Sequence, residues 1–240
     1  MTYVLLHGFT GGPASWDAVA LPSGARVIRP WLAGHGPSPA RPASWGDELE
    51  RLAALLEAEA VEGAHLVGYS LGGRVGYHLL QRCPERFARA TLIGAHPGLD
   101  DDEARRARRE ADARWIRLLR EDGLEAFLAE WERLPLWASQ ARLPAERLAA
   151  QRAQREAHAA DGLAHALEVL GLAEMPPVAP DALRLPVRLV VGAEDDKHRA
   201  LSGALASRLP SGRLTVIEGA GHNVVLERPE RLAALLTETS

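Results

Sequence analysis

The clearest indication of the fold is the run Ala64-His65-Leu66-Val67-Gly68-Tyr69-Ser70-Leu71-Gly72-Gly73. An apolar run leads into the pattern G-x-S-x-G, and the residues that follow, 71–82, have helical periodicity. A strand, a sharp turn and a helix around this pattern place a serine hydroxyl at the carboxyl edge of a sheet, and the start of the helix favours negative charge beside it. We therefore predict that Ser70 is a nucleophile or base; the alternative is a glycine-rich turn with an incidental serine.

Short apolar runs and helix-period stretches alternate along the rest of the chain. The predicted buried strands are residues 2–6, 26–30, 64–68, 89–94, 187–192 and 213–218. The predicted helices between them are residues 47–60, 71–82, 200–209 and 229–237. Strand then helix, repeated, predicts an α/β fold with a mainly parallel, doubly wound sheet.

The alternation stops between Pro97 and about Pro180, where no strand is predicted. Four helices are expected there, at residues 100–120, 124–134, 144–159 and 161–172, and the proline-rich run 175–180 closes the segment. We expect residues 1–96 and 180–240 to form the core and residues 97–179 to form a helical lid.

Composition excludes several classes of protein. The 240 residues are 47% hydrophobic with a formal net charge of −4, which is typical of a globular domain and argues against general nucleic-acid binding. No apolar run approaches the ~20 residues that cross a bilayer, and no secretory leader pattern is visible. The single cysteine, Cys83, cannot form an internal disulfide. We expect a cytoplasmic protein with no membrane partner and an inert Cys83.

A serine needs a histidine to take its proton, and the histidine needs an orienting carboxylate. The run Glu194-Asp195-Asp196 follows one late predicted strand, and Gly221-His222-Asn223 follows the next. The order Ser70, acid, His222 is that of α/β-hydrolases. Asp195 is the first choice for the acid and Asp196 the second, while Glu194 is expected to face away.

The first predicted strand ends in Leu6-His7-Gly8-Phe9. The backbone N–H of Phe9, together with that of Leu71, would form an oxyanion hole. We interpret His7 as a structural hydrogen bonder.

The remaining histidines lack the spacing of metal ligands, and neither a Walker A lysine nor a G-x-G-x-x-G motif is present. We therefore expect no metal and no cofactor. His35 is predicted to be a turn residue, and structural roles are expected for His65, His78, His158, His165 and His198.

These motifs carry a resemblance. Over its whole length the chain resembles the α/β-hydrolase superfamily, and within it the family of 2-succinyl-6-hydroxy-2,4-cyclohexadiene-1-carboxylate synthases of menaquinone biosynthesis. The matching segments are Leu6-His7-Gly8-Phe9, Gly68 to Arg74, Gly94-Ala95-His96-Pro97-Gly98-Leu99, Trp131 with Pro135, Gly192 to Asp195 with Lys197, and Gly221-His222-Asn223. Three of these matches are the most selective for the family. They are the Arg after Ser-Leu-Gly-Gly, the His-Pro-Gly-Leu and the Trp-to-Pro spacing.

The resemblance implies a lyase that eliminates pyruvate from 2-succinyl-5-enolpyruvyl-6-hydroxy-3-cyclohexene-1-carboxylate. It implies Ser70, Asp195 and His222 as the triad. It also implies five substrate-binding residues: Tyr69, Arg74, Arg108, Trp131 and Arg152.

The chemistry of the arginines agrees with a carboxylate substrate. Lys197 is the only lysine among 28 basic residues, and most of the arginine excess is expected to reflect genomic bias. A small molecule with three carboxylates needs several fixed cations, and guanidinium groups bind carboxylates bidentately. A carboxylesterase or carbon–carbon bond hydrolase with the same triad is the alternative, and a non-catalytic binding protein is a third reading that the intact triad disfavours.

Two features depart from the family pattern. The chain begins almost at its first predicted strand, so either the sheet edge is trimmed or the true start lies upstream. A trimmed edge would expose an edge strand. Leu32-Ala33-Gly34-His35-Gly36 also stands where Leu-Pro-Gly-His-Gly is commoner.

Overall fold

Six strands form one sheet in the computed structural model, which describes residues 1–36 and 40–238. The order across the sheet is β2-β1-β3-β4-β5-β6, and every pairing is parallel. The strands are β1 (Thr2–Leu6), β2 (Arg26–Ile28), β3 (Ala64–Tyr69), β4 (Phe87–Ile93), β5 (Val187–Gly192) and β6 (Gly212–Ile217). The predicted parallel α/β fold is confirmed.

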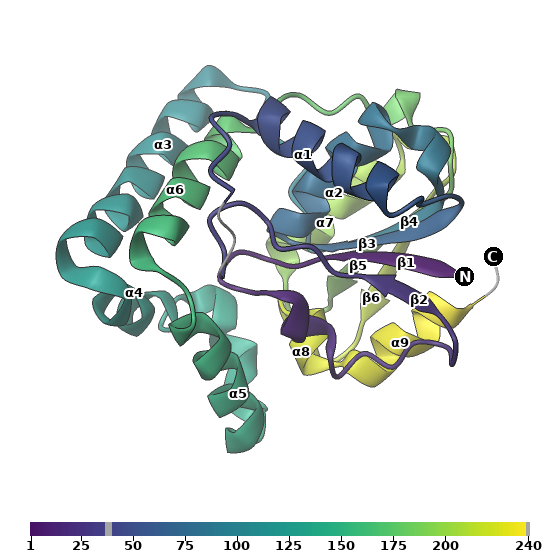
Figure 1. Cartoon of the computed structure of the whole chain (residues 1–240). Coiled ribbons are helices and arrows are strands. Elements are labelled where there is room, and N and C mark those ends of the chain that lie inside the picture. The colour runs from purple at the N-terminus through teal and green to yellow at the C-terminus, as the bar shows by residue number, and fades with distance from the viewer. Residues whose placement is uncertain (37–39, 239–240) are drawn as a thin grey trace.

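Helices cover both faces of the sheet (Figure 1). One face carries α1 (Trp45–Ala58), α2 (Leu71–Arg82) and α7 (Asp196–Ala206), whose side chains Leu52, Leu79 and Leu205 share one buried cluster. The other face carries α8 (Val224–Glu227) and α9 (Pro229–Thr237), which pack with Trp16 in a second cluster. Burial of both sheet faces explains why the strands are almost wholly apolar.

Helix starts differ from the predictions where a side chain caps the helix. The helix α1 begins at Trp45, two residues early, because the Ser44 hydroxyl accepts a 3.1 Å hydrogen bond from the N–H of Asp47. The helix α7 begins at Asp196 rather than at residue 200, because the Asp195 carboxylate accepts from the N–H of His198. Such caps satisfy N–H groups that have no partner within the helix.

The first strand is not the edge of the sheet. Thr2, Tyr3 and Val4 of β1 pair with Arg26, Val27 and Ile28 of β2, so the short strand β2 is the outermost on that side. The early start of the chain therefore leaves β1 paired on both sides.

Between β4 and β5 the described chain forms helices and no strand. The long helices are α3 (Asp102–Arg117), α4 (Gly123–Trp131), α5 (Ala145–Glu156) and α6 (Ala160–Leu170), with a π-helical turn at Leu118–Asp122 and a 3-10 helix at Pro135–Arg142. Figure 1 shows these helices as a layer beyond the carboxyl ends of the strands. They bury a cluster of their own around Phe127, Leu128 and Leu163. We propose residues 97–179 as the lid.

None of the helices in the described ranges combines the length and the apolar character that crossing a membrane requires.

Candidate active site

Ser70 lies at a strained turn between β3 and α2. Its φ of 51° and ψ of −108° are rare for a residue with a side chain, and such strain is typical of functional sites. A Cβ on Gly72 would collide with the carbonyl oxygen of Leu6, so only glycine permits α2 to pack this closely against β1. The local sequence thus forms the turn that was predicted for G-x-S-x-G.

The structure brings Ser70, His222 and Asp195 together. The His222 Nε2 lies 3.1 Å from the Ser70 hydroxyl, and His222 Nδ1 lies 2.7 Å from Asp195 Oδ2. With Nδ1–H donating to the carboxylate, Nε2 is free to accept the serine proton. Asp195, and not Asp196, occupies this position, and the Glu194 carboxylate pairs with Arg142 instead.

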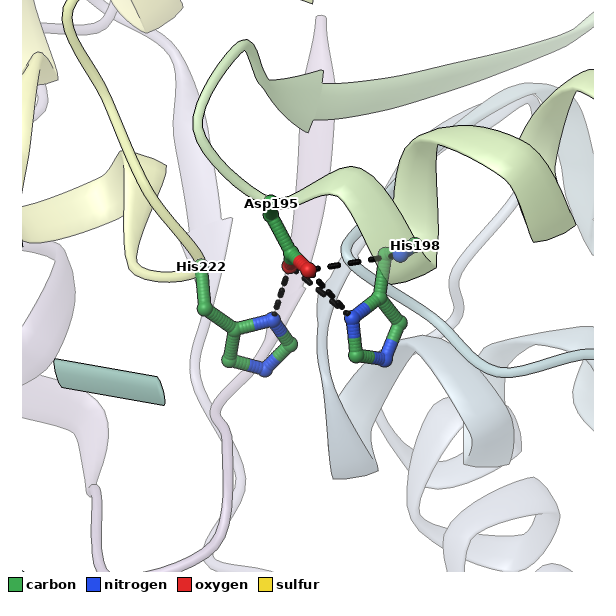
Figure 2. A group of neighbouring side chains, drawn as sticks. All are labelled: Asp195, His198 and His222. Atoms are coloured by element: carbon green, nitrogen blue, oxygen red, sulfur yellow. Dashed lines mark hydrogen bonds and ion pairs between the residues drawn. The ribbon is translucent and has the colours of Figure 1, made fainter. Parts of the chain in front are cut away.

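A third side chain, His198, joins this group (Figure 2). Its Nδ1 lies 2.9 Å from Asp195 Oδ1, and its ring centroid is 4.5 Å from that of His222. The sequence interpretation of His198 as merely structural therefore missed a direct contact with the triad. An Asp at the N-cap followed by a histidine three residues later was the available signal, because the third residue of a helix can reach back to its cap.

The two imidazoles oppose the effect of burial on the carboxylate. Burial alone would raise the pKa of Asp195, but hydrogen bonds from His198 and His222 outweigh it and hold that pKa well below its usual range. Burial lowers the pKa of His222 below 6.5, the hydrogen bond to Asp195 acts in the opposite direction, and the neighbouring His198 lowers it further. His222 is therefore a neutral acceptor near pH 7.

Asp195, His198 and His222 also offer ligand atoms within 4.8 Å of one another, the one such group among the described residues. A histidine ligand must present an unprotonated nitrogen to the metal. An ionised carboxylate only accepts hydrogen bonds, so we assign both Nδ1 atoms as donors to Asp195. The distances of 2.7 and 2.9 Å from the two Nδ1 atoms to the carboxylate are those of hydrogen bonds.

The proposed oxyanion donors lie beside Ser70. Phe9 and Leu71 both line the cavity above it, and within the described part of the chain neither N–H donates to another residue. Leu71 is the first residue of α2, where N–H groups are unpaired by helix geometry. Both N–H groups are thus available to an oxyanion.

Three buried histidines hold the loop that carries Phe9. His35 Nε2 accepts from the N–H of Thr10 at 3.3 Å, and His158 Nε2 lies 3.2 Å from the Thr10 carbonyl oxygen. His7 Nε2 accepts from the N–H of Leu32 at 3.1 Å. The structural interpretation of His7 agrees with these contacts. His35 does lie in a turn, but it is fully buried and also supports the Phe9 loop.

A cavity of about 290 Å³ lies between Ser70 and the lid. Its lining includes four of the five predicted substrate-binding residues: Tyr69, Arg74, Arg108 and Trp131. Lys197 also lines it, although no role was predicted for it. Asp112 is the only carboxylate among the lining residues described, and it binds Arg108 at 2.9 Å. Three cations facing one carboxylate leave the cavity positively charged.

Several buried donors around this cavity have no acceptor among the described residues. They are the hydroxyl of Tyr69 and the indole N–H groups of Trp131 and Trp137. Burial raises the pKa of Tyr69 well above 10, so its hydroxyl remains a donor. Buried polar groups normally have partners, and these donors therefore fit a ligand rich in acceptor oxygens.

Arg152 lies outside this cavity, contrary to the prediction. Its guanidinium is held by three carboxylates, those of Glu125, Glu132 and Glu156, at 2.6–2.9 Å. A guanidinium with its donors occupied in this way has little left for a ligand.

Arg155, one helical turn later, is placed differently. It is buried, pairs with Glu132 at 2.9 Å and lies over the Trp137 ring. It lines a second cavity of about 260 Å³, which shares Phe9, Tyr69 and Trp137 with the first. Helix α5 contains three arginines. Arg147 and Arg155 line this second cavity, Arg152 does not, and only packing distinguishes them.

Known proteins resemble this chain in sequence and in fold. The model of the alpha/beta hydrolase family matches residues 3–235. A Bacillus subtilis (strain 168) protein named putative 2-succinyl-6-hydroxy-2,4-cyclohexadiene-1-carboxylate synthase is 33% identical over 98% of this chain and 88% of its own. An Enterobacter sp. (strain 638) protein named 2-succinyl-6-hydroxy-2,4-cyclohexadiene-1-carboxylate synthase is 36% identical over 98% of this chain and 90% of its own.

Two solved structures are similar over 98% of this chain. MenH from S. aureus superposes with a TM-score of 0.91 at 25% identity and is covered over 91% of its length. A thermophilic esterase from Thermogutta terrifontis, with malate bound, superposes with a TM-score of 0.84 at 29% identity and is covered over 88%.

Proposed function

The chain belongs to the alpha/beta hydrolase family, and on that premise we propose that it is a lyase that eliminates pyruvate from 2-succinyl-5-enolpyruvyl-6-hydroxy-3-cyclohexene-1-carboxylate. The product would be 2-succinyl-6-hydroxy-2,4-cyclohexadiene-1-carboxylate, an intermediate of menaquinone biosynthesis. The names of the relatives at 33% and 36% identity support this assignment.

The cationic, donor-rich cavity above Ser70 is the observation that carries the proposal. Arg74 makes no ion pair with any described carboxylate; it donates to the carbonyl oxygen of Leu170 and lies over the Trp45 ring. A partly buried guanidinium without a counter-charge is costly unless a ligand supplies one. The proposed substrate brings three carboxylates, whereas a neutral ester brings none.

Arg74, Arg108 and Lys197 would neutralise two of these carboxylates in the main cavity. Arg155, in the neighbouring cavity beyond Tyr69, is the candidate for the third. In this proposal Arg152 does not touch the substrate. Arg152 and Arg155 both pair with Glu132, so this one carboxylate does not fully neutralise Arg155. A net positive charge therefore remains beside Tyr69.

The proposed mechanism uses Ser70 as the base. His222 takes the proton of the Ser70 hydroxyl as that oxygen removes the proton α to the succinyl carbonyl. The electrons left behind form a dienolate, whose oxygen accepts from the N–H groups of Phe9 and Leu71. The dienolate then expels the enolpyruvyl oxygen as the enolate of pyruvate, which takes the proton held by His222 and leaves as pyruvate. Positioned proton transfer contributes about 10²–10⁴-fold and each oxyanion donor about 10²–10³-fold.

A carboxylesterase activity with the same triad is the second candidate. The specific observation in its favour is the TM-score of 0.84 and 29% identity to the Thermogutta terrifontis esterase. In that reaction Ser70 would attack an acyl carbon and form a covalent intermediate. The triad geometry is the same in both cases, so the ligand decides between them.

The test is to follow pyruvate release from the enolpyruvyl substrate, beside hydrolysis of a panel of p-nitrophenyl esters, with S70A as the blank. We expect pyruvate release at an enzymatic rate and ester hydrolysis at least about 10²-fold slower in kcat/KM. Rapid ester turnover without pyruvate would reject the lyase and favour the esterase.

A further inference from the structure

The carboxylate of Asp195 serves two imidazoles at once. His222 Nδ1 lies 2.7 Å from Oδ2, and His198 Nδ1 lies 2.9 Å from both carboxylate oxygens. Figure 2 shows the two rings side by side, each with a nitrogen turned toward the carboxylate. All three side chains are buried, so solvent does little to weaken these contacts.

Helix capping fixes where His198 stands. Asp195 is the N-cap of α7, and Oδ1 accepts from the backbone N–H of His198 at 3.3 Å. The ring of the same residue then turns back and donates a second hydrogen bond to the cap. Two bonds from one residue hold the carboxylate in a single rotamer, the one that faces His222.

We propose that His198 is a positioning residue for the triad, which orients the Asp195 carboxylate and withdraws part of its negative charge from His222. The inference rests on the proposed roles of Ser70, Asp195 and His222, but not on which substrate they act upon. No other side-chain donor contacts Asp195 in the described ranges.

The expected effect on His222 follows from sharing one acceptor. A carboxylate that accepts from two N–H donors binds each less strongly than it would bind one, so the imidazolium form of His222 is stabilised less. Protonation of His198 would add a positive charge beside the His222 ring, which acts in the same direction. His198 therefore lowers the pKa of His222, so His222 stays unprotonated, and able to act as a base, down to a lower pH.

Other charged and titratable groups face this pair and stay unchanged in the test below. They are Lys197 on α7, His96 after β4, Tyr69 and Ser70 at the end of β3, Arg74 on α2, Arg108 on α3 and Glu227 on α8.

Two variants separate the donor from the bulk of the ring. In H198N the amide nitrogen can occupy the position of Nδ1 and donate to Asp195, whereas H198L places a methyl group there. H165N and H165L are the matched controls, because His165 on α6 hydrogen-bonds the Pro42 carbonyl oxygen and lies outside the cavity lining.

The measurement is kcat/KM against pH, with whichever of the enolpyruvyl substrate or p-nitrophenyl acetate the protein turns over. On the plateau we expect H198N to stay within about threefold of the wild type and H198L to fall about tenfold. The acidic limb should move to higher pH by about half to one unit in H198L, and by less in H198N. Equal plateaus and equal limbs in both variants would overturn the proposal.

A second readout does not depend on activity. In ¹⁵N-histidine-labelled wild-type protein, NMR should show His198 protonated at Nδ1 in its neutral form, and the His222 titration should move to higher pH in H198L. His198 in the Nε2–H tautomer would overturn the proposal. If the protein turned over neither substrate, the proposed function would fail while this NMR test still decided the role of His198.

Discussion

The Nη1 of Arg74 donates a 2.9 Å hydrogen bond to the carbonyl oxygen of Leu170. This bond joins the first turns of α2, which starts next to Ser70, to the end of the lid helix α6. The neighbouring Arg108 is paired with Asp112, but Arg74 is not paired with any described carboxylate. Arg74 is thus both a lid contact and the cation most available to a substrate.

Replacing Arg74 by lysine should lower kcat/KM for the tricarboxylate at least about tenfold. A lysine cannot bind a carboxylate bidentately. Burial and the nearby Arg108 already lower the pKa of Arg74 to about 9, and an ammonium group there would lose its proton more readily still. Pyruvate release at pH 7.5 measures the effect, with R26K on the distant strand β2 as the control. A loss of less than threefold would contradict bidentate binding.

Replacing Ser70 by alanine should lower the rate of pyruvate release by about 10²–10⁴-fold. Stability should change little, because alanine has nearly the same preference for the backbone conformation and only one hydrogen bond to His222 is lost. Thermal unfolding should show a Tm within about 4 °C of the wild type. A much larger fall in Tm would mean that the serine is structural.

Arg152 and Arg155 should differ when each is replaced by alanine. In either variant Glu132 keeps the other arginine as its partner, so neither change leaves this half-buried carboxylate unpaired. We expect R155A to raise KM for the tricarboxylate about tenfold and R152A to change it less than threefold. Steady-state kinetics of both variants decides the matter, and the reverse order would restore Arg152 as the substrate-binding residue.

The buried histidines should make the fold less stable in mild acid. Burial lowers the pKa of His7 to about 4 and also lowers the pKa of His35 and His158. The histidines therefore bind protons below about pH 6.5 in the unfolded chain, but only at lower pH in the folded chain. Because the unfolded chain binds more protons in this range, the free energy of unfolding is highest above pH 6.5 and declines below it. His7 alone should cost about 2 kcal/mol by pH 5.

Urea unfolding at pH 7.5 and pH 5.0 measures this loss, and H7Q should reduce it relative to the wild type. Each protein is compared with itself at the two pH values, so that an effect of H7Q on stability that does not depend on pH cancels. Equal stability of the wild type at both pH values would contradict a neutral histidine cluster.

Much of the fold was predictable because hydrophobic periodicity reports burial directly. The strands β1 and β5 and the helices α2 and α9 have the predicted bounds, since each is delimited by local features such as the Ser70 turn or Pro229. The start of α7 was missed because a capping aspartate looks like a loop residue until its side chain is placed.

The amino-acid sequence alone indicated the succession of strands and helices along the chain, the turn at Ser70, and Ser70 and His222 as two of the residues that meet there. For the acid it favoured Asp195 but left Asp196 open. These features depend on short-range spacing and on the rule that parallel strands end at one edge of a sheet. Only the tertiary structure decided that Arg155 rather than Arg152 faces the second cavity and that His198 shares the Asp195 carboxylate. The first outcome depends on which side of a helix packs inward, and arginines one turn apart look alike in the sequence. The second depends on where the helix cap lies and which rotamer its neighbour adopts, and the sequence shows neither.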